Sequence, residues 1–328
     1  MKVSICIPTY NQAQFLSTAV LSAIHQADVE AEIWISDDAS TDDTPRTVAA
    51  LQQEHPRLIT KRHPHNLGMG GNPNWLLRQP DSEFLVKLDS DDALEPQFCV
   101  RLLALLTQYP AAGYAHGAVH QIDALGKTTR VRRLSRLKEY VDSEESLADH
   151  ASGYRVSANI IMFRRRALEQ VNFWRADMAF ADDWDLAVRL ADAGWGNVYC
   201  ADIIANYRVW SDGRGYRQGR KVAELDGIRR VFADSLCPAY ERRGWDLRPL
   251  LQRRRRIAVA QANALAGMAE GTAENAKIRS ALHEMGDSKA LHASFWLIDH
   301  RLGFILLIVA RGRLWITDCC KRILSVLE

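Results

Sequence analysis

The feature that most constrains the fold is an alternation of short apolar runs with segments of helical periodicity over the first third of the chain. Helical spacing of apolar residues occurs at 13–26, from Pro45 to about Glu54, and at 95–109. The strand-like runs between them are Val3–Ile7, Glu32–Ser36, Leu58–Lys61, Phe84–Leu88 and Gly113–Ile122. Strands that alternate with helices predict a parallel sheet covered by helices on both faces.

Acidic residues follow two of these strands and begin a later helix. The pairs and runs are Asp37-Asp38, Asp89–Asp92 and Asp182-Asp183. Carboxylates beside an apolar core must be solvated, paired or bound to a metal. Ligands of parallel sheets bind beyond the carboxyl ends of the strands. We therefore expect the residues after the first strand, Pro8–Asn11, to share one site with the first two acidic segments.

Each acidic segment also has a structural interpretation. Asp89 and Asp91 suit a hard cation such as Mg²⁺ or Mn²⁺, but they are equally typical of a solvated turn in which Asp92 caps a helix. Asp38 can accept hydrogen bonds from a nucleobase or ribose, or it can serve as a turn residue. These alternatives remain open on the sequence alone.

The helix that begins at Asp182 and ends near Gly194 divides its acidic residues between two roles. Asp182 lies three residues before Asp185, which predicts a capping pair. Asp183 is then free to act as a general base. The helix N-terminus lowers the pKa of such a carboxylate and acidic neighbours raise it, so the sequence leaves the balance open.

Residues 63–74 contain several glycines and prolines and are predicted to form a loop before a short helix near Trp75. Gly68, Gly70 and Gly71 allow close approach of the backbone to a ligand, or simply give a flexible surface loop. No glycine-rich dinucleotide or P-loop pattern follows a strand.

Five segments, in this order, resemble those of family-2 glycosyltransferases with the GT-A fold: residues 3–11, 35–42, 66–74, 88–96 and 182–189. The resemblance covers about residues 2–215. It implies an α/β fold, with a Rossmann-like, mostly parallel central sheet flanked by helices and a helical C-terminal extension. The implied domains are a catalytic domain at 1–219, with a nucleotide-binding half (about 1–115) and an acceptor-binding half (about 116–219), and a helical region at 220–328.

The same resemblance implies an activity. A sugar would pass, with inversion, from a nucleotide-diphosphate donor to a hydroxyl of a glycan or lipid-linked acceptor in cell-surface polysaccharide synthesis, with Mn²⁺ or Mg²⁺ as cofactor. Asp183 would be the catalytic base, Asp91 with Asp89 would bind the metal, and Asp182 and Trp184 would lie on the acceptor side. The donor would contact Pro8, Thr9, Tyr10, Asn11, Asp38, Gly68, Asn74, Asp89 and Ser90.

The chain departs from the family pattern at three positions. Pro73 stands where many members have Arg, and Asp182 replaces a Glu. Trp210 stands where many members have a metal-binding His, so Asp212 or water would have to replace that metal ligand. A non-catalytic sugar-nucleotide-binding or scaffold protein is therefore the alternative. A nucleotidyltransferase is disfavoured because no glycine-rich basic loop follows the first strand.

Charge and composition limit the classes of partner that we expect. A net charge of +2 gives no electrostatic argument for nucleic acid. The cysteines lack metal-ligand spacing, and no signal peptide or membrane span is recognised, so we expect a cytoplasmic protein with reduced thiols. Residues 294–323 mix aromatic and basic side chains, a combination compatible with peripheral contact with the inner face of the cytoplasmic membrane. Packing on the protein itself or in a homo-oligomer is the alternative.

Overall fold

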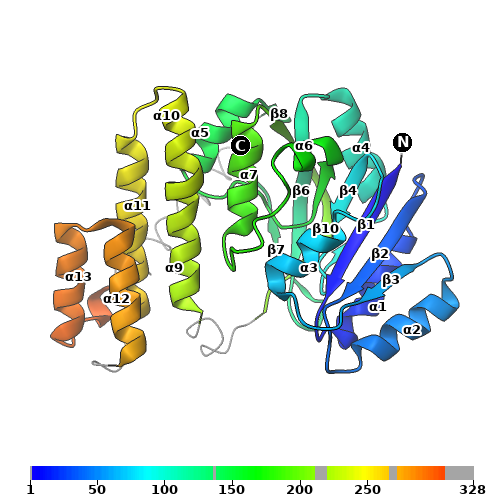
Figure 1. Ribbon diagram of the computed structural model, residues 1–328, viewed down its shortest axis with the longest axis horizontal. Helices are drawn as coiled ribbons and strands as arrows, with labels where there is room; N and C mark the ends of the chain where they lie inside the picture. Colours follow the sequence, from blue (N-terminus) through cyan, green and yellow to red (C-terminus); the bar gives the residue numbers. More distant parts are fainter. Residues whose placement is uncertain (1, 136–137, 211–219, 266–271, 307–328) are drawn as a thin grey trace. The chain divides into compact units, whose positions relative to one another are not determined.

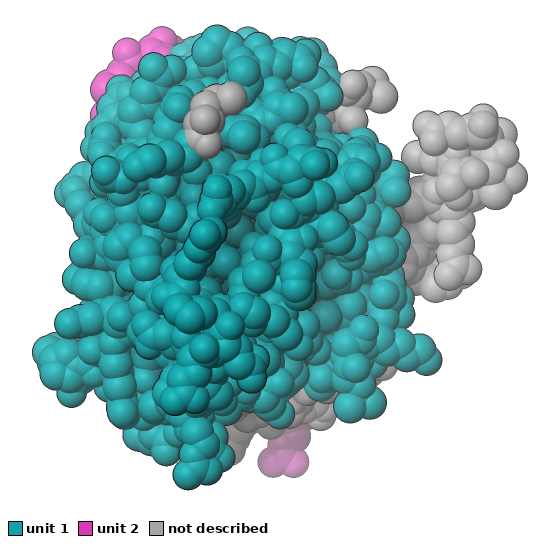
Figure 2. Space-filling model, turned by 90° about the vertical axis from the view of Figure 1, so that its right-hand side faces the viewer, with its two compact units in different colours: residues 1–211 teal, residues 212–328 magenta. Residues whose placement is uncertain are grey.

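The computed structural model describes residues 2–135, 138–210, 220–265 and 272–306. The chain divides into two compact units, Met1–Ser211 (unit 1) and Asp212–Glu328 (unit 2), which Figure 2 distinguishes by colour. The predicted domain boundary at 219 falls in 211–219, outside the described residues. The division of the catalytic domain into nucleotide and acceptor halves stays a prediction.

Unit 1 is built on one sheet with the strand order β3-β2-β1-β4-β9-β6-β10-β5. These strands are β1 (Val3–Thr9), β2 (Ala31–Asp37), β3 (Ile59–Arg62), β4 (Phe84–Lys87), β5 (Ala93–Leu94), β6 (Ala112–Ile122), β9 (Ile161–Arg164) and β10 (Gly196–Arg208). β7 (Thr128–Arg132) pairs with β6, and β8 (Tyr140–Val141) pairs with β10. The four strands β3, β2, β1 and β4 run parallel, and β6 runs parallel to β10.

β9 is inserted antiparallel between β4 and β6, so these two strands still run in the same direction. The predicted α/β class and mostly parallel sheet are confirmed. The alternation of strands and helices did not reveal β9, because its neighbours in the sheet lie far away in the sequence.

Helices cover both faces of this sheet (Figure 1). They are α1 (Ala13–Ile24), α2 (Thr44–Glu54), α3 (Gly68–Leu76), α4 (Phe98–Gln108), α5 (Ser143–Ala151), α6 (Arg165–Gln170) and α7 (Asp182–Asp192). Successive side chains of β1 enter different hydrophobic clusters, Ile5 and Ile7 on one face and Cys6 on the other. Burial on both faces explains why these strands read as continuous apolar runs.

The segment expected to be a loop at 63–74 instead contains most of α3. Asn72, at 3% exposure, donates its side-chain amide to the carbonyl oxygen of Ser36 at 3.0 Å and accepts from the Ser36 hydroxyl at 2.6 Å. These contacts to β2 hold a helix that the glycines and the internal Pro73 disfavour in isolation. The prediction was wrong here because a tertiary contact overrides local propensity.

All regular secondary structure in the described residues of unit 2 is helical. Its elements are α9 (Lys221–Arg230), the π-helix η1 (Val231–Leu236), α10 (Cys237–Arg242), α11 (Arg248–Gln261), the 3₁₀ helix η2 (Ala262–Leu265), α12 (Ala273–Gly286) and α13 (Lys289–Asp299). Leu225, Ile278 and Leu282 belong to one apolar core, into which α13 places Phe295 and Ile298. No described helix combines the length and the apolar character needed to cross a membrane. Residues 307–323 of the predicted membrane contact lie outside the described residues.

Candidate functional site

The carboxyl ends of three neighbouring parallel strands create the edge on which the site is built. Thr9 of β1 is in register with Asp37 of β2. On the other side of β1, the backbone N–H of Leu88, just after β4, donates to the carbonyl oxygen of Cys6. The residues that follow these strands therefore emerge side by side at one edge of the sheet, as the sequence predicts.

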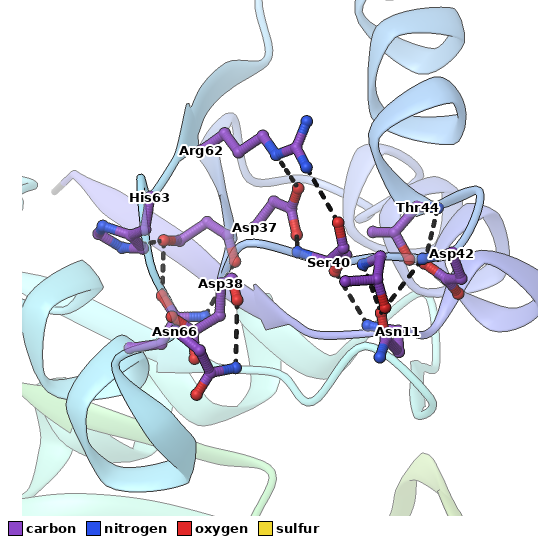
Figure 3. A network of polar contacts seen from close by, with 12 residues as sticks. Asn11, Asp37, Asp38, Ser40, Asp42, Thr44, Arg62, His63 and Asn66 are labelled. Atoms are coloured by element: carbon purple, nitrogen blue, oxygen red, sulfur yellow. Dashed lines mark hydrogen bonds and ion pairs between the residues drawn. The ribbon is translucent and has the colours of Figure 1, made fainter.

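Hydrogen bonds of Asn11 link the loop after β1 to the loop after β2 (Figure 3). Its backbone N–H donates to Ser40 Oγ at 2.9 Å, and its side-chain oxygen accepts from the backbone N–H of Thr41 at 2.8 Å. Asn11 and Ala39 both adopt positive φ, at 52° and 58°, a conformation that is costly for residues other than glycine. Strained backbone held by hydrogen bonds fixes the shape of this edge.

Asp37 and Asp38 have different partners. Asp37 accepts from the backbone N–H of Ser40 at 3.0 Å and lies 3.3 Å from the guanidinium of Arg62 (Figure 3). These contacts stabilise the turn that follows β2. Asp38 is 2% exposed, and its two carboxylate oxygens accept from the backbone N–H groups of Leu67 and Gly68 at 2.7 and 2.9 Å. Asp38 thus anchors the entry to α3, and its predicted nucleotide contact stays a prediction.

The other residues predicted to bind the donor differ in exposure. Tyr10 is 46% exposed, Pro8 is half-buried, and the buried hydroxyl of Thr9 has no hydrogen-bond partner in the part of the chain that the structure describes. Asn74 lies in α3, where its side-chain oxygen accepts from Arg78 at 3.3 Å. The hydrogen bond from Arg78 ties Asn74 to its own helix, and its donor contact stays a prediction.

The end of β10 holds the segment that follows β4. The backbone N–H of Arg208 donates to an oxygen of Asp92 at 2.7 Å, and its side chain donates to the carbonyl oxygen of Asp91 at 2.8 Å. The indole N–H of Trp210 donates to Asp91 Oδ2 at 2.8 Å. Ser90, between Asp89 and Asp91 in the sequence, is 4% exposed. Asp212, suggested as a replacement ligand, lies outside the described residues.

Crowded carboxylates dominate the electrostatics of this segment. Burial raises the pKa of Asp91, the charge of Asp89 raises it further, and the Trp210 hydrogen bond opposes both. Burial, with the charges of Asp89 and Asp91, raises the pKa of Asp92 well above its usual range. Such a cluster favours a bound cation, because a positive charge relieves both the desolvation and the mutual repulsion.

Lys87, which no sequence motif singled out, connects the acidic segments at 89–92 and 182–183. Its ammonium lies 2.5 Å from Asp89 Oδ1. Burial disfavours the charged form of Lys87, but the charges of Asp89, Asp182 and Asp92 outweigh burial and raise its pKa. The sequence signal was a single basic residue inside a buried strand, directly before an acidic run.

α7 brings the third acidic segment to this site. It begins after Ala181, whose φ is 57°, and Asp183 Oδ1 accepts from the backbone N–H of Trp184 at 2.7 Å. The predicted capping pair is wrong, because no side chain caps the helix. Instead Asp185 is fully buried and pairs with Arg175 at 3.3 Å and Arg189 at 2.6 Å.

Both carboxylates at the start of α7 are harder to ionise than in water. Burial raises the pKa of Asp183, against hydrogen bonds from the Trp184 backbone and Asn159 and the charge of Lys87. Burial and the charge of Asp183 raise the pKa of Asp182 to about 7. The sequence left open whether the helix N-terminus or acidic neighbours dominate the pKa of Asp183, and burial has the largest effect.

Two aromatic residues near Asp183 bear on its role. Trp184 is 7% exposed and donates its indole N–H to the carbonyl oxygen of His150 at 3.0 Å, so its ring packs between α5 and α7. Its acceptor contact stays a prediction that this buried position does not support. Tyr154, which no sequence motif singled out, donates its hydroxyl to Asn159 Oδ1 at 3.1 Å, and burial and the charge of Asp183 raise the pKa of Tyr154 well above the usual range.

The protein-family model "Glycosyl transferase family 2" matches residues 4–171, slightly more than half of the chain. The succinoglycan biosynthesis protein ExoO of Rhizobium meliloti is 32% identical over 206 residues, which cover 58% of this chain and 56% of ExoO. The alignments with the first curated relatives cover between 14% and 56% of those proteins.

Two solved structures share the fold. Staphylococcus aureus TarS 1–349 in complex with UDP-GlcNAc superposes with a TM-score of 0.64 at 16% identity, over 95% of this chain and 92% of that one. The mannosyltransferase PcManGT of Pyrobaculum calidifontis, in complex with GDP-Man and Mn²⁺, gives a TM-score of 0.56 at 19% identity, over 96% and 87% of the two chains. At these identities the likeness establishes the GT-A arrangement alone.

Proposed function

Because the chain belongs to glycosyl transferase family 2, we propose that unit 1 transfers a sugar from a nucleotide-diphosphate donor to a hydroxyl group of a glycan or lipid-linked acceptor, with inversion at the anomeric carbon. The similarity to ExoO supports a role in cell-surface polysaccharide synthesis. The observation that carries the proposal is Lys87, whose charge interacts with Asp89 after β4 and with Asp182 and Asp183 of α7. These charge interactions support a single site that contains both the donor side and the proposed base.

The donor would lie along the edge where β1, β2 and β4 end. Tyr10 offers an exposed ring for a nucleobase, and the braced loops at Asn11 and Asp38 keep this edge rigid. The nucleotide sugars named with the two solved structures, UDP-GlcNAc and GDP-Man, support this class of donor and leave the base and the sugar undefined.

Asp89 and Asp91 would hold Mn²⁺ or Mg²⁺. Oxygen ligands suit these hard cations, and the pKa of Asp91 is raised first by burial and then by the charge of Asp89, both of which a bound cation would offset. The ion, when bound, supplies charge stabilisation to the diphosphate leaving group. Trp210 supplies no ligand atom, but its indole N–H orients Asp91, as outer-shell partners commonly do.

Asp183 would act as the general base. It takes the proton of the acceptor hydroxyl while that oxygen bonds to the anomeric carbon, and the bond from this carbon to the diphosphate oxygen breaks. A raised pKa improves a carboxylate for this task, because a base is most effective when its pKa approaches the operating pH. Lys87 stays protonated nearby and keeps the charge of the surrounding carboxylates compensated.

A donor screen tests the proposal. We expect one class of nucleotide-diphosphate sugar to raise the melting temperature in the presence of Mn²⁺, since a ligand at 100 times its Kd stabilises by about 2.7 kcal/mol. The double variant Asp89→Asn/Asp91→Asn should lose this shift, whereas Asp202→Asn, an exposed carboxylate paired with Arg101, should keep it. Stabilisation by no sugar nucleotide would contradict the proposal. Binding without any release of nucleoside diphosphate, with acceptor present, would favour the non-catalytic alternative.

We also propose that residues 294–323 contribute to a peripheral membrane contact. Trp296 and Phe304 are 54% and 55% exposed, whereas Phe295 and Ile298 are buried in the core of unit 2. A chain that ends at residue 306 keeps that core and removes the basic segment beyond it. Flotation with anionic liposomes should recover the full chain and not the shortened one, and equal recovery of both would refute the contact.

A further inference from the structure

Two imidazoles and one carboxylate meet in unit 2 where α12 is followed by α13. His283 is in the last turn of α12, Asp287 follows the final residue of that helix, and His292 is in the first turn of α13. Nδ1 of His283 lies 3.2 Å from Oδ1 of Asp287, and Nε2 of His292 lies 2.8 Å from the same oxygen. Figure 1 shows these two helices side by side.

We propose that His283, Asp287 and His292 bind a divalent transition-metal ion, and Zn²⁺ is the ion that we expect. Their ligand atoms all lie within 4.8 Å of one another. In a tetrahedral site with metal–ligand bonds of about 2.0–2.1 Å, neighbouring ligand atoms are ~3.3 Å apart. The distances of 3.2 and 2.8 Å from Asp287 Oδ1 to the two imidazole nitrogens are already close to that edge length, so small side-chain rotations admit the ion.

The types of ligand atom indicate which metal the cluster would bind. Two imidazole nitrogens and one carboxylate oxygen suit Zn²⁺ and its neighbours in the transition series, whereas Mg²⁺ and Mn²⁺ favour oxygen ligands such as those after β4. The three side chains are 42%, 64% and 59% exposed, in the order of their numbers. Solvent therefore reaches the cluster and can supply the coordination that three protein ligands leave open.

Packing holds the cluster in place. The His283 ring meets the Phe295 ring edge-on at 5.1 Å between centroids, and Phe295 is 6% exposed in the core of unit 2. A side chain at Gly286 would place its Cβ 2.7 Å from Cγ of Arg255, so α11 lies directly against the turn before Asp287. After the turn, Ser288 Oγ accepts from the backbone N–H of Leu291 at 3.2 Å and caps α13.

This arrangement has a consequence for stability. Without an ion, Asp287 Oδ1 lies within hydrogen-bonding distance of both imidazoles, so the three side chains form a small polar cluster. An ion that binds only the folded chain would join α12 to α13 and stabilise unit 2 by mass action. The inference concerns residues of unit 2 alone, and its test does not depend on glycosyl transfer in unit 1.

Calorimetric titration of the full chain with Zn²⁺, in saturating Mg²⁺ to occupy the carboxylates of unit 1, tests the site. We expect one Zn²⁺ per chain for the wild type. Asp287→Asn and His292→Gln should bind at least tenfold more weakly, since each loses one of three ligands. The matched control is His25→Gln, which removes an exposed imidazole from unit 1 and should bind like the wild type.

Titration with Co²⁺ provides a second readout that does not depend on a variant's folding. We expect visible absorption bands typical of a site with nitrogen ligands in the wild type, and displacement of those bands by Zn²⁺. Far-UV circular dichroism verifies that both variants retain their helices. A wild type that binds no Zn²⁺ under these conditions, or binds it no more tightly than folded His292→Gln, would overturn the proposal.

Discussion

Trp210→Phe should weaken metal binding while leaving the fold intact. The indole N–H is 2.8 Å from Asp91 Oδ2, and the Trp210 ring meets the Phe15 ring edge-on at 5.1 Å between centroids. Phenylalanine keeps an aromatic ring against Phe15 and lacks the hydrogen-bond donor of the indole. The substitution therefore isolates the contact that orients Asp91.

The size of the effect follows from that one hydrogen bond. A hydrogen bond to a charged group contributes about 1.5–3 kcal/mol, and loss of an outer-shell partner typically lowers metal affinity about 10–100-fold. These two ranges agree, since 1.4 kcal/mol corresponds to about a factor of ten. Trp210 is 41% exposed, so water partly replaces the lost donor and we expect a value near the lower end, about tenfold.

The assay is a calorimetric titration with Mn²⁺ in the presence of a saturating nucleoside diphosphate. Trp296→Phe is the matched control, because Trp296 is an exposed tryptophan of unit 2 and should leave the affinity unchanged. An Mn²⁺ affinity for Trp210→Phe within twofold of the wild type would refute the idea that the indole orients a metal ligand. A rise in affinity would show that Trp210 obstructs the ion.

Two further predictions concern stability. Asp185→Asn should lower the free energy of unfolding by about 3–5 kcal/mol, measured by urea denaturation, because it leaves Arg175 and Arg189 without their buried partner. A loss below 1 kcal/mol would contradict this account. Asp182→Asn tests the raised pKa: folded Asp182 keeps its proton up to about pH 7, but the unfolded chain releases it near pH 3.8, so the wild type loses stability between these values. The stability of Asp182→Asn relative to the wild type should rise over that interval, by at most about 4 kcal/mol, and a flat difference would refute the pKa assignment.

Strand ends and acidic segments were predictable from the sequence because they depend on local pattern. A buried strand needs an apolar run, and a carboxylate directly after it marks the edge of the sheet. This reasoning located β1, β2 and β4 and the segments that follow them to within one or two residues. The resemblance to a known family added the order of the segments and the expected role of each carboxylate.

The remaining features depend on contacts between distant residues, which local pattern does not encode. α3 exists because Asn72 reaches Ser36, and the entry to α3 is anchored by Asp38 rather than left free. Lys87 gains its significance only when α7 brings Asp182 close to it. The capping prediction for Asp182 failed because Arg175 and Arg189 draw Asp185 into the core instead.

The most direct test of the account is turnover of the matching sugar nucleotide and acceptor by the wild type and by Asp183→Asn, with Mn²⁺ and with chelator. We predict release of nucleoside diphosphate that requires the ion and falls by about 10²–10⁴-fold in the variant, the usual contribution of a positioned base. Donor affinity should be retained. Turnover of Asp183→Asn close to that of the wild type, or wild-type turnover that persists in chelator, would contradict the central claim of metal-dependent transfer with Asp183 as the base.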